Sequence, residues 1–110
     1  MERFVKGDIL VLPFPFSDLS NSKNRPALVL VNLPGEDIIL RQITSQQSND
    51  LFSISLKGKD FVSGSLRKDS YIRPNRAFTA NKSLILYKVG SISSHKFAEV
   101  RNKIVSLLDQ

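Results

Sequence analysis

The sequence predicts a mainly β fold, a small strand-rich β-barrel closed by one C-terminal α-helix. Short apolar runs, bounded by Gly, Pro and polar clusters, predict strands along most of the chain. From Ser94 onward, the apolar residues recur at helical spacing instead. A length of 110 residues predicts a single domain, residues 1–110, built around one core.

The first strand is expected at Asp8–Phe14, an apolar run that ends in Pro13-Phe14-Pro15. Phe14 itself is expected to plug one end of the barrel, since prolines flank it. The next segment, Ser17–Asn24, is rich in turn-forming and polar residues and therefore predicts a loop. This loop leads directly to Arg25-Pro26.

Two further strands, Ala27–Leu33 and Asp37–Ile43, are expected to form a hairpin about the turn-forming dipeptide Pro34-Gly35. In antiparallel pairing, the start of one strand of a hairpin lies beside the end of the other. This pairing brings Arg25 and Thr44 to the same edge of the sheet. The functional hypothesis depends mainly on this step.

The polar segment Thr44–Asp50 predicts a second loop, and Phe52–Leu56 then alternates apolar residues with serines, as a half-buried strand does. Lys57–Asp60 turns the chain. A strand beginning at about Ser70 is expected to end at Pro74, because proline removes a hydrogen bond from the ladder.

The segment Ser83–Ile92 leaves two interpretations open: one strand interrupted at Gly90, or a helical turn followed by a strand. The final helix is amphipathic, with Ser93 or Ser94 as its cap. Its apolar stripe either covers the barrel or forms a dimer seam, and both can hold for different residues. The stripe contains Phe97, Val100, Ile104, Leu107 and Leu108, while Lys96, Glu99, Arg101 and Lys103 lie on the other faces.

Composition excludes several kinds of chemistry. Cysteine is absent and His95 is the only histidine, which rules out disulfides, thiolate nucleophiles, zinc sites and paired-histidine proton shuttles. His95 is expected to be exposed and without a catalytic role. The net charge of +6 favours polyanionic partners through counterion release, although a basic solvated surface has the same composition.

The chain is expected to be a cytoplasmic protein without a membrane partner. No stretch reaches the roughly 18 unbroken apolar residues that a membrane span requires. Charges occupy Met1–Lys6 where a signal peptide would need its apolar core.

A guanidinium and a hydroxyl at neighbouring strand ends suit a site that handles a phosphodiester. Arginine binds anionic oxygens bidentately, and a hydroxyl both donates and accepts hydrogen bonds. Arg25 and Thr44 therefore point toward RNA. The alternative is that Arg25 is a solvated side chain beside a proline, and that Thr44 and Ser45 are ordinary turn residues bonded to the local backbone.

Several segments, in their order and spacing, resemble the MazF, PemK and Kid family, the ribonuclease toxins of type II toxin–antitoxin systems. Singly, an Arg-Pro or Thr-Ser pair carries no such information. The resemblance runs from Gly7 nearly to the C-terminus. It rests on Gly7–Phe16, Arg25–Leu30, Ile43–Ser45, Asp69–Pro74 and Lys88–Ile92.

The resemblance implies a compact SH3-like barrel of the PemK/CcdB type with a terminal helix, usually assembled as a symmetric homodimer. It also implies cleavage of single-stranded RNA without metal or other cofactor, and neutralisation by a labile antitoxin. An acidic, disordered antitoxin segment could occupy the RNA path. Carried over residue by residue, the resemblance makes Arg25 and Thr44 catalytic, Ser45 a helper, and Arg73 a further functional arginine.

Two departures from the family leave the general base open. Some members have a carboxylate where this chain has Asn75, a neutral amide that cannot act as a base. Some also have a histidine in the first loop, which this chain lacks. Asp18 and Asp69 are the best-placed carboxylates, and either one acts as the base or holds Arg25 or Arg73 in position. The candidate RNA-contacting residues are Asp18, Lys23, Gln46, Asp69, Arg73, Asn75 and Arg76.

The sequence thus favours a toxin that is a metal-independent, sequence-selective endoribonuclease. Attack by the ribose 2′-hydroxyl would leave 2′,3′-cyclic phosphate and 5′-hydroxyl ends, and the transition state would require a fixed cation such as Arg25. One alternative is a non-enzymatic toxin resembling the CcdB branch, which poisons DNA gyrase by binding. The other is a small basic barrel that binds nucleic acid structurally.

Overall fold

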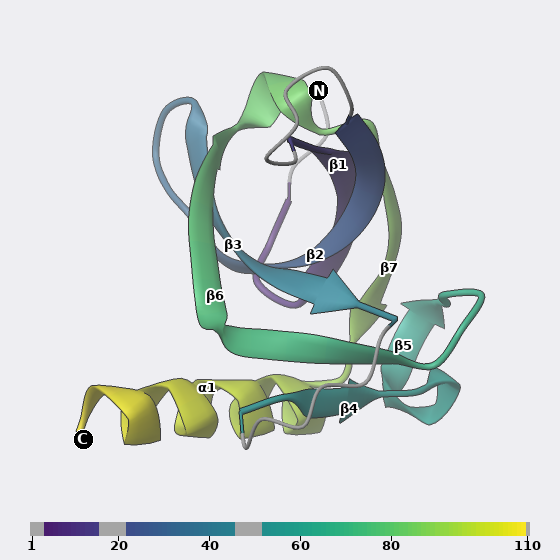
Figure 1. The fold of residues 1–110 in the computed structure, drawn as a ribbon, viewed down its shortest axis with the longest axis vertical. Coiled ribbons are helices and arrows are strands. Elements are labelled where there is room, and N and C mark those ends of the chain that lie inside the picture. Colours follow the sequence, from purple (N-terminus) through teal and green to yellow (C-terminus); the bar gives the residue numbers. More distant parts are fainter. Residues whose placement is uncertain (1–3, 16–21, 46–51, 110) are drawn as a thin grey trace.

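The computed structural model describes residues 4–15, 22–45 and 52–109. Their strands form one seven-stranded sheet with the order β4-β6-β3-β2-β1-β7-β5, in which all neighbours pair antiparallel. This confirms the predicted mainly β fold (Figure 1). The elements are β1 (Asp8–Pro15), β2 (Ser22–Asn32), β3 (Asp37–Thr44), β4 (Ile54–Leu56), η1 (Gly58–Asp60), β5 (Phe61–Gly64), β6 (Ser70–Asn81), η2 (Lys82–Leu84), β7 (Tyr87–Ile92) and α1 (Ser94–Leu108).

The sheet curls into a barrel whose wall consists of β1, β2, β3, β6 and β7 (Figure 1). α1 runs along the outside of this barrel, beside β4 and the first part of β6. The C-terminal helix therefore covers one side of the barrel, as the sequence predicts.

Two apolar clusters lie on opposite faces of the curled sheet. Because both faces of β1 and β2 are covered, these strands read as continuous apolar runs rather than as an alternation. The cluster inside the barrel contains Leu10, Leu12, Ala27, Val29, Ile38, Leu40 and Ala80, with Phe14 and Phe78 packed against it. The outer cluster, between the sheet and α1, contains Ile9, Leu28, Ile43, Ile54, Leu56, Ile72, Ile92 and Val100.

β2 begins earlier than the sequence predicts, so the expected loop is wrong at its C-terminal end. Lys23 pairs with Phe14, and Arg25 pairs with Leu12. The start of β2 consists of exposed polar residues, a composition typical of loops, so the sequence pattern does not indicate a strand there. Pro26 is tolerated there because the register with β3 begins only at the following residue, where β2 gains its second neighbour.

β6 continues through Pro74 to Asn81, so the predicted strand end at Pro74 is wrong. Along β6, the register with β3 jumps from Ile72 to Ala77, and Pro74 lies within this irregularity. The missing N–H of Pro74 therefore breaks no hydrogen-bonded pair with β3. Figure 1 shows the result, a strand that turns a sharp corner.

β4 is shorter than expected, and β5 is a strand that the sequence did not predict. β5 pairs with β7, where Gly64 lies opposite Gly90. Gly64 has a φ of +70°, and a Cβ added to it would lie 1.9 Å from the Val89 carbonyl oxygen. Gly90 therefore allows the backbones of β5 and β7 to approach closely, and β7 continues through it without interruption.

Of the two interpretations of Ser83–Ile92, the helical turn followed by a strand is correct, because η2 precedes β7. The predicted cap of α1 is also confirmed at Ser93, whose hydroxyl accepts a hydrogen bond from the backbone N–H of Lys96 at 3.1 Å. His95 is exposed, as expected.

The side chain of Lys96 is buried, although the helical pattern places it off the apolar stripe. Its Nζ donates to the Ser55 carbonyl oxygen at 3.1 Å and to Glu99 Oε1 at 2.9 Å. It also lies 3.7 Å from Asp60 Oδ2. The ammonium group therefore ties the start of α1 to β4 and η1.

Candidate functional site

The antiparallel register brings the start of β2 and the end of β3 together. The β2–β3 ladder ends where Ala27 pairs with Gln42, and extending its register by two residues would set Arg25 opposite Thr44. Cross-strand neighbours have Cβ atoms about 5 Å apart. Residues two apart share a face, and Ala27 belongs to the inner cluster. Arg25, Gln42 and Thr44 therefore lie on the inner face of the hairpin.

β6 adds two residues to this end of the barrel. Tyr71 is the cross-strand partner of Thr44. Arg73 follows Ile72, which pairs with Ile43 and belongs to the outer cluster, so Arg73 lies on the same face of β6 as Tyr71, at the point where the β3–β6 register is interrupted. We refer to Arg25, Gln42, Thr44, Tyr71 and Arg73 as the mouth residues.

The mouth residues that the sequence predicts as site residues are only partly accessible to solvent. Arg25, Thr44 and Arg73 are each half-buried, which restricts their rotamers and favours a fixed geometry. Lys23, opposite Phe14, and Ser45, directly after β3, are exposed. The guanidinium groups of Arg25 and Arg73 and the hydroxyl of Thr44 thus lie at the same end of the barrel. Lys23 and Ser45 add an exposed cation and an exposed hydroxyl close to them in the sequence.

The other predicted site residues contribute less. Asp69 is exposed and directly precedes β6. Asn75 and Arg76 lie within β6 at its register irregularity, and their side chains are outside the described part of the structure. Asp18 and Gln46 both fall outside the described residues.

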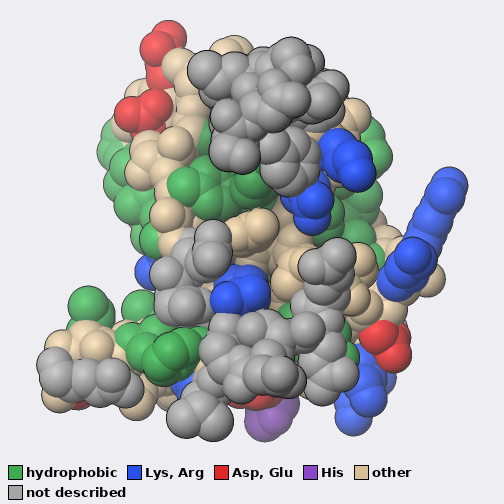
Figure 2. All heavy atoms as spheres, viewed as in Figure 1, with side chains coloured by type: hydrophobic (Ala, Val, Ile, Leu, Met, Phe, Trp, Pro, Cys, Tyr) green, Lys and Arg blue, Asp and Glu red, His purple; other side chains and the backbone are tan. Residues whose placement is uncertain are grey.

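The face of the molecule that looks down the barrel is rich in cations. Figure 2 shows Lys and Arg side chains at the middle and on the right of this face, while the acidic side chains in view lie toward its edges. Together with the net charge of +6, this distribution suits a polyanionic ligand.

Arg41 is a further half-buried arginine, but it lies on the opposite face of β3. It pairs with Leu28, a member of the outer cluster. Within the part of the chain that the structure describes, its buried Nε and Nη1 have no hydrogen-bond partner. Burial lowers the pKa of the Arg41 guanidinium from its usual value. Arg41 is therefore not one of the mouth residues.

Sequence reasoning missed two of the mouth residues, Gln42 and Tyr71. The signal for Gln42 was its position two residues before Thr44, which puts both on one face of a strand. Tyr71 could be found only from its pairing with Thr44, which joins strands far apart in the sequence.

Among the residues that the structure describes, no three His, Cys, Asp or Glu side chains come together in a way that could hold a metal ion. The described helices likewise include none with the length and apolar character needed to cross a membrane.

The structure therefore defines a small curled β-barrel with a C-terminal helix and a cationic mouth. Residues 5–108 match the family described as the PemK-like, MazF-like toxins of type II toxin–antitoxin systems. The chain belongs to this family. A comparison with curated protein sequences gave no match.

Solved structures share the fold at low sequence identity. An endoribonuclease in complex with its cognate antitoxin, from a mycobacterial species, is 13% identical with a TM-score of 0.75, covering 97% of this chain and 96% of that one. MazF in the MazE–MazF complex of Deinococcus radiodurans is 22% identical with a TM-score of 0.75, covering 96% and 95%. A structure of MazF from the same organism is 22% identical with a TM-score of 0.71, covering 96% of each chain.

Proposed function

We propose that this toxin is a metal-independent, sequence-selective endoribonuclease that cleaves single-stranded RNA in the cytoplasm. The proposal is supported by the β2–β3 register, which ends at the Ala27–Gln42 pair and, if extended by two residues, would bring Arg25 to Thr44 at one end of the barrel. Arg73, on the neighbouring strand, adds a second cation. Family membership and a solved neighbour described as an endoribonuclease support the same activity.

In the proposed reaction, the ribose 2′-oxygen attacks the adjacent phosphorus and the bond from phosphorus to the 5′-oxygen breaks. The 2′-hydroxyl loses its proton and the departing 5′-oxygen gains one, which leaves 2′,3′-cyclic phosphate and 5′-hydroxyl ends. Arg25 stabilises the charge that develops on the non-bridging oxygens. Thr44 orients the 2′-hydroxyl or donates to a phosphate oxygen, and Ser45 assists.

The test is to incubate the purified protein with a long mixed-sequence transcript in excess EDTA and to analyse the new ends. We expect cleavage to persist, with 5′-hydroxyl ends that polynucleotide kinase labels without prior phosphatase treatment. A requirement for divalent metal, or the appearance of 5′-phosphate ends, would contradict the proposed reaction.

The same preparation distinguishes the two alternative functions. A gyrase-binding toxin of the CcdB type would inhibit DNA supercoiling and leave the transcript intact. A structural nucleic-acid-binding barrel would bind RNA with a strong salt dependence, without cleavage products and without growth arrest on expression.

We further propose that the toxin is neutralised by a cognate antitoxin whose acidic, partly disordered segment occupies the RNA path. The cations at the mouth and the net charge of +6 would attract such a segment. Two of the similar solved structures are complexes with an antitoxin. Titrating the antitoxin into the cleavage reaction should abolish cleavage, and excess RNA should compete with it.

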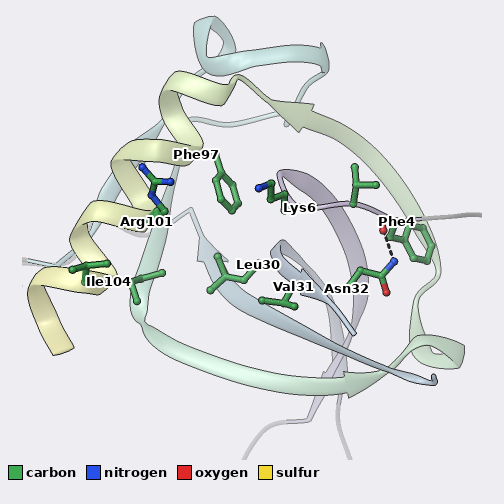
Figure 3. A pocket seen from close by; sticks show the side chains of 10 residues that line it. Phe4, Lys6, Leu30, Val31, Asn32, Phe97, Arg101 and Ile104 are labelled. Atoms are coloured by element: carbon green, nitrogen blue, oxygen red, sulfur yellow. Dashed lines mark hydrogen bonds between the residues drawn. The ribbon is translucent and has the colours of Figure 1, made fainter. Parts of the chain in front are cut away.

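We also propose a symmetric homodimer, joined through the groove between β2 and α1. This groove of about 600 Å³ is lined mainly by apolar side chains, and Figure 3 shows Leu30 and Val31 on the β2 side with Phe97 and Ile104 on the helix. Val31 and Val105, which line it, are 43% and 49% exposed. A two-fold axis would cover each apolar surface with its own copy.

The dimer proposal is tested by light scattering on Val105→Asp. The carboxylate would be buried unpaired in the seam, so we expect the variant to elute as a monomer where the parent chain is a dimer. Val62→Asp is the matched control, because Val62 is an exposed valine on β5 away from the groove. A parent chain that is monomeric at micromolar concentration, or a dimeric Val105→Asp variant, would contradict the proposal.

A further inference from the structure

A second cavity opens at the mouth of the barrel, inside the curled sheet. It has a volume of about 740 Å³ and receives residues from β1, β3, β6 and η2. Its lining includes Leu12, Phe14, Gln42, Phe78 and Asn81. The space is ample for one flat heterocyclic ring system, and small-molecule sites have cavities of this size.

The wall of this cavity is aromatic and aliphatic. Phe14 and Phe78 pack edge to face, with ring centroids 4.8 Å apart and an angle of 73° between the rings. Both rings are only partly buried, so the pair retains surface that faces the cavity. Aromatic surface of this kind is what an unstacked nucleobase packs against.

Gln42 supplies the polar counterpart. It is half-buried, and its amide offers a hydrogen-bond donor and an acceptor side by side. The β3–β6 register passes directly from Arg41 to Ile43, so Gln42 lies at the irregularity where the sheet opens. An amide in this position can pair with two adjacent groups on the edge of one base.

The cavity is adjacent to the proposed cleavage site. Gln42 and Thr44 are two residues apart on the same face of β3, which corresponds to about 7 Å along a strand. Leu12, which lines the cavity, is the cross-strand partner of Arg25. A nucleotide whose phosphate lies at Arg25 and Thr44 therefore has its base within reach of the cavity.

We propose that this cavity is a nucleobase subsite, in which Gln42 reads the edge of one base flanking the scissile phosphate while the Phe14–Phe78 pair packs against its face. This inference rests on the proposed function and deepens it, because it names the source of sequence selectivity. Adenine is the base whose edge a glutamine amide matches best. Specificity at this position comes from the barrel, and the loops need not supply it.

The test compares the parent chain with Gln42→Met, which keeps the size of the side chain and removes its hydrogen bonds. A series of RNA oligonucleotides containing one cleavage site carries an abasic nucleotide at each successive position. In the parent chain, we expect base removal at one flanking position to reduce the single-turnover rate by about tenfold or more. In Gln42→Met, the same removal should cost several-fold less than in the parent chain, because the amide contacts are already absent and only the packing on Phe14 and Phe78 remains to be lost.

Asn102→Ala is the control, since Asn102 is an exposed amide on α1 outside this cavity, and it should retain the full abasic penalty. Circular dichroism confirms that both variants are folded, and the abasic series on the parent chain is independent of any variant. If the parent cleaves RNA but Gln42→Met shows the parent's penalty at every position, the subsite is wrong and the nuclease stands. If the parent cleaves no RNA, both proposals fail.

Discussion

Ala27 in β2 is the antiparallel partner of Gln42 in β3, and the geometry of the candidate site follows from this pair. This is the last pair of the β2–β3 ladder at this end, and extending its register by two residues would set Arg25 opposite Thr44. Ala27 is fully buried, whereas Arg25, two residues earlier on the same face of β2, is half-buried. These two residues therefore mark the transition from the core to the mouth of the barrel. The side chains that we place in catalysis are thus anchored directly on the packed interior.

Arg25→Ala should reduce the rate of RNA cleavage by about two orders of magnitude or more, by analogy with the loss of one oxyanion donor. Arg25→Lys should recover only part of this loss, because an ammonium cannot bind two phosphate oxygens in the bidentate manner of a guanidinium. Single-turnover assays on one oligonucleotide measure both. A reduction of less than threefold in Arg25→Ala would show that another cation stabilises the transition state.

Thr44→Val should reduce the cleavage rate at least tenfold more than Ser45→Ala does. Valine has the shape of threonine without the hydroxyl, so the substitution tests the oxygen alone, and positioned proton donors contribute about 10² to 10⁴ in rate. Thr44 is half-buried and paired with Tyr71, whereas Ser45 is exposed beyond the end of β3. Equal losses in the two variants would mean that Ser45 shares the chemistry with Thr44.

Arg73→Ala should weaken RNA binding in a salt-dependent way. If Arg73 contacts one phosphate, its removal should lower the slope of log K against log salt by about 0.7, the value for a single-stranded ligand. The measurement uses an oligonucleotide with a 2′-deoxy nucleotide at the cut site, which binds without being cleaved. Arg67→Ala, at an exposed arginine outside the strands, should leave the slope unchanged.

Local sequence patterns predicted the β2–β3 hairpin and the last helix well, because both depend on neighbouring residues. Pro34-Gly35 turns the chain, and Gly35 has the positive φ of 93° that a glycine accommodates without strain. The patterns failed where distant pairing overrides composition. β2 starts in a polar segment because β1 is there to pair with it, and β6 passes through Pro74 because the ladder with β3 is interrupted there.

The residues of the candidate site could likewise be predicted only where their pairing is local in the sequence. Arg25 and Thr44 could be brought together from the sequence, since they belong to the two strands of one hairpin. Tyr71 could not, because its pairing with Thr44 joins segments separated by other strands. Gln42 shares a strand face with Thr44, but the cavity that gives its amide a proposed role is formed with residues of β1, β6 and η2, which the sequence does not bring together.

Arg41→Met should stabilise the isolated chain by about 1 kcal/mol, measured as an increase in the midpoint of urea unfolding at constant slope. Arg41 Nε and Nη1 are shielded from water and lack a hydrogen-bond partner among the described residues, which is a cost that methionine avoids. Methionine also matches the apolar surroundings of Leu28. Arg67→Met, at an exposed position, should change the midpoint very little. A destabilised Arg41→Met variant would show that the guanidinium makes a favourable contact in solution.

Lys96→Met should destabilise the fold by about 1 to 3 kcal/mol, because it leaves buried polar groups without their partner. The ammonium group of Lys96 contacts the Ser55 carbonyl oxygen and lies 3.7 Å from Asp60 Oδ2. Asp60 is itself only 9% exposed, so its carboxylate would lose its buried counter-ion. Urea unfolding should show a lower midpoint for Lys96→Met, whereas Lys59→Met, at an exposed lysine of η1, should behave as the parent chain does.

The double variant Lys96→Met with Asp60→Asn separates the loss of the ion pair from the loss of packing. Asparagine removes the unpaired charge and keeps an oxygen that can accept the hydrogen bond that the Lys57 N–H now donates to Asp60 Oδ2 at 2.8 Å. The double variant should therefore be more stable than Lys96→Met alone, by an interaction energy of at least 0.5 kcal/mol for residues in direct contact. Strictly additive effects would mean that Lys96 stabilises α1 through the Ser55 carbonyl and not through Asp60. In that case the link between α1 and η1 would be the backbone hydrogen bond that the Ser93 N–H donates to the Asp60 carbonyl oxygen at 2.8 Å.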